Sequence, residues 1–174
     1  MFWRMKIDSA LMQNAPEVYA RLQAEKARRS LLEFTKQSWP ILEPGRPFVD
    51  GWPIHAMCEH LEAVAREEIT YLLITVPPGS MKSRLTRVNF PLWLWMTKPY
   101  MKVLGASYAL SLAERDNVYA RTILQTDWYK SLANVGVSSE SAGKTNFEND
   151  KTGKANIASG YTYSGHPVGA AAAI

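Results

Sequence analysis

The chain has 174 residues and a formal net charge of +4, with 47% hydrophobic and 21% charged residues. This length supports one domain with a substantial core and leaves little room for a second. The composition is that of a globular protein, and the positive charge permits nucleic-acid binding without requiring it. The single cysteine, Cys58, excludes a disulfide framework within the chain and fits a reducing compartment.

No segment of the sequence has the pattern of a signal peptide or a membrane span. The most apolar stretch, residues 90–96, is far shorter than the ~20 residues that a spanning helix needs. Residues 1–6 mix aromatic and basic side chains, which is not the pattern of a secretory signal. We therefore expect a soluble, intracellular protein that does not contact a membrane.

The first third of the chain predicts two helices. Asn14 and Pro16 indicate the start of the first helix, since asparagine caps helices and proline fits their first turn. This helix is predicted to end at Trp39, because the residue before a proline avoids the helical region. After a loop at residues 41–51, a second helix is expected to begin near Trp52.

The middle of the chain alternates between strand and helix patterns. Residues 71–76 form a continuous apolar run that predicts a strand buried on both faces. A helix is expected to follow a proline-rich loop, and Pro91 should end or kink it unless the register shifts. Residues 101–107 predict a second buried strand, and residues 110–124 an amphipathic helix with Val118 among its core residues. This order predicts an α/β fold with a parallel sheet flanked by helices.

The pattern weakens in the last third of the sequence. Residues 145–157 predict a hairpin with a polar turn, because residues 145–147 and 155–157 flank the polar cluster at residues 148–153. The tail, residues 161–174, is rich in glycine and alanine and has no clear period.

The segment with the strongest chemical meaning is the loop after the first predicted strand. Residues 73–83 read Leu-Ile-Thr-Val-Pro-Pro-Gly-Ser-Met-Lys-Ser, so a strand leads into a tight loop and then a helix, as in phosphate-binding loops. Backbone amides and the positive end of the helix dipole would then face one anion. Lys82 would contact the β- and γ-phosphates and the Ser83 hydroxyl would bind Mg²⁺.

The loop matches the standard pattern G-x-x-x-x-G-K-[ST] only in part. Val76 and Met81 stand where glycines are expected, and Gly79 is the one glycine in the loop. The alternative is a proline-rich turn that carries a surface lysine.

The loop nevertheless resembles the variant Walker A loop of one group of phage large terminases. The similar segment is Val-Pro-Pro-Gly-Ser-Met-Lys-Ser at residues 76–83. Residues 48–62 are similar to the segment that these proteins carry upstream of the loop, and residues 104–121 to the strand and helix that follow it. Residues 128–129 and 147–150 continue the resemblance, which covers roughly residues 30–160.

The resemblance implies a P-loop ATPase that uses ATP and Mg²⁺. In such a site Lys82 would be catalytic and Ser83 would hold the metal ion. The phosphate-binding residues would be Pro78, Gly79, Ser80, Met81, Lys82 and Ser83.

Other residues in the similar segments are candidates for contacts to adenine or to a neighbouring subunit. Phe48, Trp52 and His55 precede the loop, where such motors hold adenine, although simple packing of this loop onto the sheet is the favoured explanation. Arg115 and Arg121 are candidate arginine sensors of nucleotide across a ring interface, with a structural ion pair as the alternative for Arg115.

Further charged and metal-ligating residues have simpler explanations. Arg84 and Arg87 could contact DNA or a neighbouring subunit, but a solvated helix face is the simpler expectation. His55, Cys58 and His60 do not predict a zinc site, because no fourth ligand lies near them.

The resemblance also implies a truncated motor domain. We expect a helical segment at residues 1–46, a partial ATPase core at residues 47–160 and the tail at residues 161–174, so that the fold is incomplete at its C-terminus. The second acidic motif and the nuclease domain of the family are missing, since no acidic residue follows Asp150. This chain alone should therefore hydrolyse ATP weakly or not at all.

The expected function is ATP hydrolysis coupled to translocation of double-stranded DNA into a viral capsid. By resemblance, the partners are double-stranded DNA, a small terminase subunit and a portal, within a ring homo-oligomer in the host cytoplasm. One alternative is an inactive remnant that only binds DNA or a motor subunit. Another is a helicase-like P-loop ATPase, whereas a kinase is disfavoured because no arginine-rich lid is found.

Overall fold

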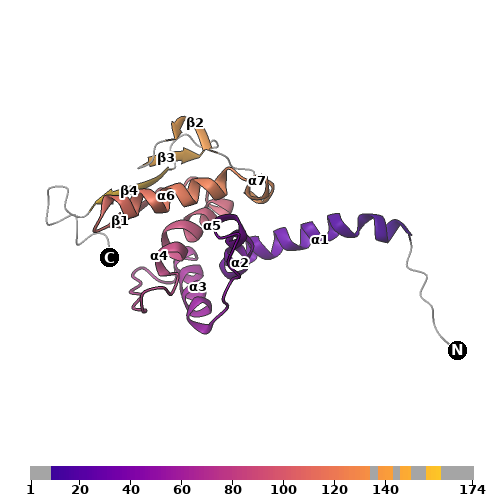
Figure 1. The fold of residues 1–174 in the computed structure, drawn as a ribbon, viewed down its shortest axis with the longest axis horizontal. Coiled ribbons are helices and arrows are strands. Elements are labelled where there is room, and N and C mark those ends of the chain that lie inside the picture. The colour runs from indigo at the N-terminus through magenta and orange to yellow at the C-terminus, as the bar shows by residue number, and fades with distance from the viewer. Residues whose placement is uncertain (1–8, 134–136, 143–145, 150–155, 162–174) are drawn as a thin grey trace.

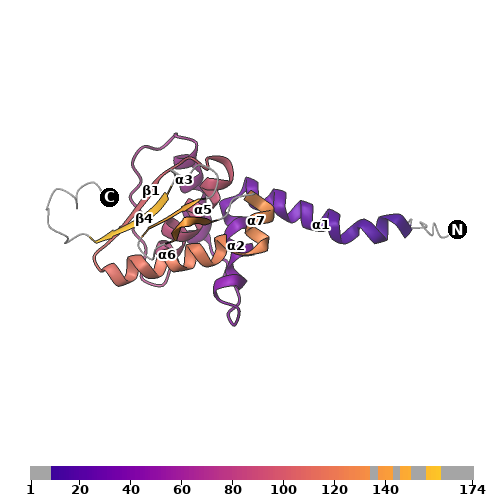
Figure 2. The ribbon, with the colours of Figure 1, turned by 90° about the horizontal axis from the view of Figure 1, so that it is seen from above.

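The computed structural model describes residues 9–133, 137–142, 146–149 and 156–161. The helices are α1 (Ser9–Arg29), α2 (Leu31–Leu42), α3 (Trp52–Ala65), α4 (Lys82–Arg84), the π-helical turn η1 (Leu85–Asn89), α5 (Phe90–Thr97), α6 (Leu110–Leu124) and α7 (Asp127–Ala133). The strands are β1 (Val103–Ser107), β2 (Val137–Ala142), β3 (Asn146–Asn149) and β4 (Asn156–Tyr161). Helices form the body, and α1 projects from it on one side (Figures 1 and 2).

The expected parallel α/β sheet of a P-loop NTPase-like fold is wrong. The described residues are mainly helical, and the four strands form a mixed sheet in the order β1-β4-β3-β2. Only β1 and β4 pair in parallel, with Val103 opposite Ile157, while the other neighbours are antiparallel. The sheet lies beside α6 rather than between two helical layers (Figure 1).

The first predicted strand, residues 71–76, is not part of any described strand. Its side chains alternate, because Leu72 and Ile74 pack against the core while Tyr71 is 88% and Leu73 79% exposed. The apolar run predicts burial on both faces, but only one face is covered. Its interpretation as a central strand fails for this reason.

The expected first helix is two helices, because Ser30 interrupts it. Ser30 has an extended backbone, and its hydroxyl accepts a hydrogen bond from the Glu33 amide at 3.4 Å. The Leu31 amide donates to the Glu62 carboxylate from α3 at 2.6 Å. The helix then continues through Pro40 to Leu42, so the predicted end at Trp39 is also wrong. The proline is tolerated in the last turn, where the Glu43 amide still donates to the Trp39 carbonyl at 2.9 Å.

The helical run that follows the loop passes Pro91 by a change of register. The η1 turn widens the helix so that the Phe90 amide donates to the Leu85 carbonyl, five residues back. Pro91 then lies in the first turn of α5, where its missing N–H is tolerated. This shift of register is the exception foreseen from the sequence, and it keeps residues 82–97 in one continuous helical run.

The helices enclose one hydrophobic core. Its largest fully buried side chains are Trp95, Tyr129, Phe34, Leu31, Leu85, Leu92, Ile123, Leu124 and Val88. The predicted helix at residues 110–124 is confirmed, but Val118 is 38% exposed and does not belong to the core. The predicted hairpin is confirmed by the antiparallel pairing of β3 and β4, and its turn and most of the tail lie outside the described residues.

The buried Tyr129 predicts a specific loss of stability in alkali. Its hydroxyl donates to the Leu92 carbonyl at 2.7 Å, and burial raises the pKa of Tyr129 well above its ordinary value. Below the ordinary tyrosine value of about 10 the contribution is fully present, and it is lost as pH rises, because only the unfolded state releases the proton. Tyr129→Phe should cost about 1 kcal/mol at neutral pH and remove this dependence.

Urea unfolding of both proteins at about pH 7 and about pH 10.5 measures the effect. Cys58 is present in both proteins, so its own raised pKa cancels in the comparison. Equal losses of stability in the two proteins between these pH values would contradict the prediction.

No helix among the described residues is long and apolar enough to cross a membrane.

Candidate phosphate-binding site

The loop between residues 71–76 and α4 is a tight turn followed directly by a helix start. The Ser80 hydroxyl donates to the Pro77 carbonyl at 2.6 Å, and the Ser80 amide reaches the same oxygen at 3.4 Å. Pro78 and Gly79 occupy the two central positions, and Gly79 has φ 85°. Proline followed by a residue with positive φ is the sequence that a type II turn requires. The turn reverses the chain immediately before the helix.

Met81 connects this turn to the helix in a left-handed conformation. Its φ is 61°, which is uncommon for a residue other than glycine and costs conformational energy. Met81 is the N-cap of α4 and supplies no side-chain acceptor to the first turn. The first amides of the run at residues 82–97 therefore lack both intrahelical and side-chain partners. Free amides at a helix start attract anions.

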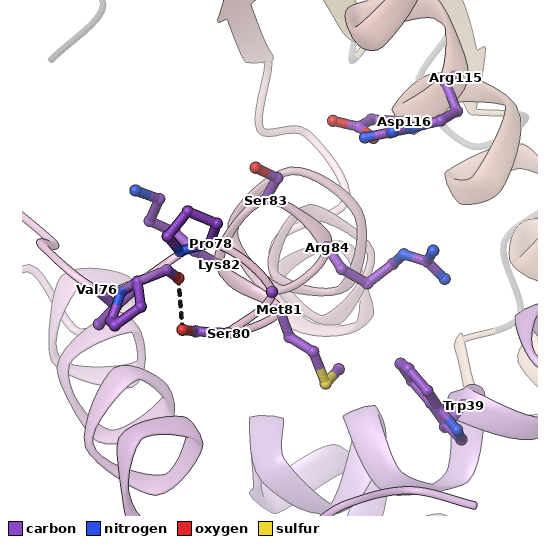
Figure 3. A pocket seen from close by; sticks show the side chains of 12 residues that line it. Trp39, Val76, Pro78, Ser80, Met81, Lys82, Ser83, Arg84, Arg115 and Asp116 are labelled. Carbon is purple, nitrogen blue, oxygen red and sulfur yellow. Dashed lines mark hydrogen bonds and ion pairs between the residues drawn. The ribbon is translucent and has the colours of Figure 1, made fainter. Parts of the chain in front are cut away.

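The residues at this helix start line a cavity of about 450 Å³. It is lined by Trp39, Val76, Pro77, Pro78, Gly79, Ser80, Met81, Lys82, Ser83, Arg84, Arg115 and Asp116 (Figure 3). All six predicted phosphate-binding residues are in this lining. The structure thus brings the loop, the start of the helical run, Trp39 of α2 and the middle of α6 together.

Lys82 lies where two cavities meet. It also lines a second cavity of about 530 Å³ together with Ser83, Arg115 and Asp116, between residues 72–74 and 106–108. Its side chain is exposed, and the described part of the chain offers its ammonium group no ion-pair partner. In Figure 3 it points away from Arg84 across the helix start. A mobile cation at this place can fold over an anion bound to the loop.

Asp116 is a buried carboxylate on α6 that was not predicted as a site residue. Arg115 donates to Asp116 Oδ1 from Nη2 at 3.0 Å and from Nε at 3.2 Å. Arg87 Nη1 lies 3.3 Å from Asp116 Oδ2, which is an ion pair without hydrogen-bond alignment. Burial lowers the pKa of Arg87, whereas Asp116 acts in the opposite direction. Arg115 thus forms a structural ion pair, which is the alternative to its role as an arginine sensor.

The expectation that Arg84 and Arg87 lie on a solvated face is wrong. Both side chains are only 17% exposed, because α2 and α6 cover this side of the helical run. Arg84 pairs with Glu43 at 3.1 Å, and its guanidinium lies 4.2 Å from the ring centroid of Tyr119. Arg84 Nη1, Arg87 Nε and Asp116 Oδ2 are buried without a hydrogen-bond partner.

The three adenine candidates do not line the cavity at the loop. Trp52 is 79% exposed and borders a separate depression on α3. His55 Nε2 lies 2.6 Å from Asp50, whose pKa is lowered chiefly by the hydrogen bond from Lys36. Phe48 packs edge-on against Trp39 with the ring centroids 5.8 Å apart. Trp39 lines the cavity, whereas Phe48 does not.

Arg121 lies near the C-terminal end of α6 and lines neither cavity at the loop. Its expected role is to sense nucleotide across an interface with a neighbouring subunit, and this role stays a prediction.

The loop fits a polyphosphate better than it fits a metal ion alone. Ser83 places one exposed hydroxyl at the cavity, and Asp116, the one carboxylate in its lining, is engaged by two guanidinium groups. The described residues contain no cluster of three or more His, Cys, Asp or Glu side chains that could hold a metal. Mg²⁺ would therefore be bound through phosphate oxygens with Ser83 as the protein ligand, as is usual for this ion.

No protein-family model, curated protein or solved structure matches this chain. The resemblance to phage large terminases therefore rests on the sequence segments described above.

Proposed function

We propose that the chain binds a nucleoside triphosphate with Mg²⁺ at residues 77–84, as the nucleotide-binding part of a DNA-packaging motor of the large terminase kind. The observation that carries the proposal is the uncapped start of the helical run behind the left-handed residues Gly79 and Met81. The residues that carry these amides line one cavity together with the cationic side chains of Lys82, Arg84 and Arg115. Free amides, a helix dipole and cations on one concavity are the elements of phosphate recognition.

The same site predicts weak hydrolysis by this chain. Phosphoryl transfer needs groups that orient the attacking water and stabilise charge at the transition state. Asp116 is held by Arg87 and Arg115, so it is not free to orient water. The chain's own residues would bind the phosphates and neutralise their charge. Double-stranded DNA, a small terminase subunit and a portal are proposed as partners by the resemblance alone.

Lys82→Ala should weaken binding of Mg-ATP about tenfold or more, because a charge-assisted contact to phosphate is lost. Equilibrium binding of a fluorescent ATP analogue measures this effect. Lys130→Ala is the matched control, since Lys130 is an exposed lysine on α7 whose contact to Asp127 is 3.7 Å long. The control should bind like the unchanged protein.

Equal affinity of Lys82→Ala and Lys130→Ala for ATP would overturn the proposal. Salt-dependent binding of double-stranded DNA without any nucleotide binding would instead favour the inactive remnant that binds only DNA.

A further inference from the structure

The extended segment at residues 71–76 has no backbone partner among the described residues. None of the hydrogen bonds between described residues involves an amide or carbonyl of this segment. Its side chains nevertheless alternate as in a strand, with Leu72 and Ile74 against the core and Leu73 79% exposed. A strand-like segment with unpaired amides and carbonyls is a template for pairing with another extended segment.

Strand β1 offers a second open edge across a cavity. The sheet order β1-β4-β3-β2 gives β1 a neighbouring strand on one side only within the described part of the chain. The second cavity, of about 530 Å³, lies between residues 72–74 and residues 106–108, and Leu112 adds to its apolar lining. An occupant that satisfies backbone groups along both walls is itself an extended polypeptide, and this lining favours apolar side chains.

The chain that follows β4 begins beside this cavity. β4 runs parallel to β1, and its last residue, Tyr161, lies opposite Ser107, which lines the cavity. Residues 162–174 come next and lie outside the described residues. To reach the far side of β1, the chain must cross two strand spacings, or about 10 Å. Residues 162–167 are long enough for this connection, because six extended residues span up to about 20 Å.

The sequence at residues 168–174 has the chemistry that the cavity favours. It reads Val-Gly-Ala-Ala-Ala-Ala-Ile and contains no polar or charged side chain. Its small side chains suit a space between two segments whose own side chains already line it. As a strand, it is long enough to pair with the whole of residues 71–76 and with β1. A segment that enters from the end of β1 after a short connection runs antiparallel to β1.

We infer that residues 168–174 dock in the second cavity as a strand between residues 71–76 and β1, antiparallel to β1. This docking pairs the two open edges and partly covers Leu73. The inference does not depend on the proposed nucleotide binding, because it concerns backbone pairing and the burial of apolar side chains.

Hydrogen exchange at the amides of residues 71–76, followed by NMR in the full chain, tests the docking. Alternate amides of this segment would face the docked strand and should exchange at least about tenfold more slowly than open-chain amides. Ala171→Pro should return them to fast exchange, because proline removes a donor and is not accommodated in a central strand. Ser164→Pro is the matched control, since it places the same residue in the connection, and it should keep the protection.

Fast exchange at every amide of residues 71–76 in the unchanged chain would overturn the inference. Protection that persists in Ala171→Pro would also overturn it, and a dependence on protein concentration would then identify a second copy as the occupant. The amides of α6 show whether the variants keep the fold, because this helix packs in the core. Their exchange should be the same in all three proteins.

Discussion

Replacing Asp116 with alanine should lower the free energy of unfolding by about 3–5 kcal/mol, because it leaves Arg87 as a buried charge without a partner. Asp116 is 3% exposed on α6, and Arg87 Nη1 lies 3.3 Å from its Oδ2. Arg115 loses its partner as well, but its side chain is 49% exposed, so water can solvate it. Urea unfolding of the variant and the unchanged protein measures the difference.

A double variant tests whether the unpaired charge is the cause. Arg87→Met with Asp116→Leu removes both partners and fills their space with apolar groups, so it should recover most of the lost stability. A loss below about 1 kcal/mol in Asp116→Ala would contradict the assignment of a buried pair. Such a small loss would mean that water solvates the pair of Arg87 and Asp116 in solution.

Replacing Trp95 with alanine should cost about 3–5 kcal/mol through loss of burial and the cavity left behind. Trp95 is fully buried on α5, and its indole Nε1 donates to the Met101 carbonyl at 2.8 Å. The carbonyl would lose this donor as well, which adds to the cost. Chemical unfolding monitored by circular dichroism measures the change.

Trp52→Ala is the matched control for this experiment, since it removes the same ring from a site that is 79% exposed. We expect a change within about 0.5 kcal/mol there. Similar losses for the two tryptophans would show that Trp95 is not in the core.

Helices with a clear apolar period, the strand at Val103–Ser107 and the hairpin of β3 and β4 could be predicted from the sequence, while the pairing of the strands in a mixed sheet could not. Residues 52–65 and 110–124 repeat apolar residues at helical spacing, and both helices form near the expected places. The apolar run at residues 71–76 has no such period, and its burial depends on what covers its second face. Exposed Tyr71 and Leu73 show that the described structure covers only one.

The break at Ser30 and the continuation through Pro40 are decided by tertiary and local contacts. The Glu62 carboxylate that accepts from the Leu31 amide lies on another helix, so the sequence pattern around Ser30 could not reveal this contact. The first helix was therefore predicted as one piece. The rule that a helix ends before proline is a bias, and the missing N–H of Pro40 removes only one intrahelical hydrogen bond shortly before α2 ends at Leu42.

The loop of the candidate site could be predicted because its residues are consecutive. A proline, a glycine and a Lys-Ser pair within residues 77–83 indicate a turn and a helix start in any fold. Trp39 and Asp116 could not be found in this way. They come from α2 and α6, and only the packing of these helices against the helical run brings them to the cavity.

The central claim is that the backbone amides of the loop bind phosphate, and amide chemical shifts observe this directly. In a titration of the ¹⁵N-labelled protein with Mg-ATP, the largest shifts should occur at the amides of residues 79–84, and tripolyphosphate should move the same signals. A titration in which these amides stay unchanged while signals elsewhere move would contradict the claim.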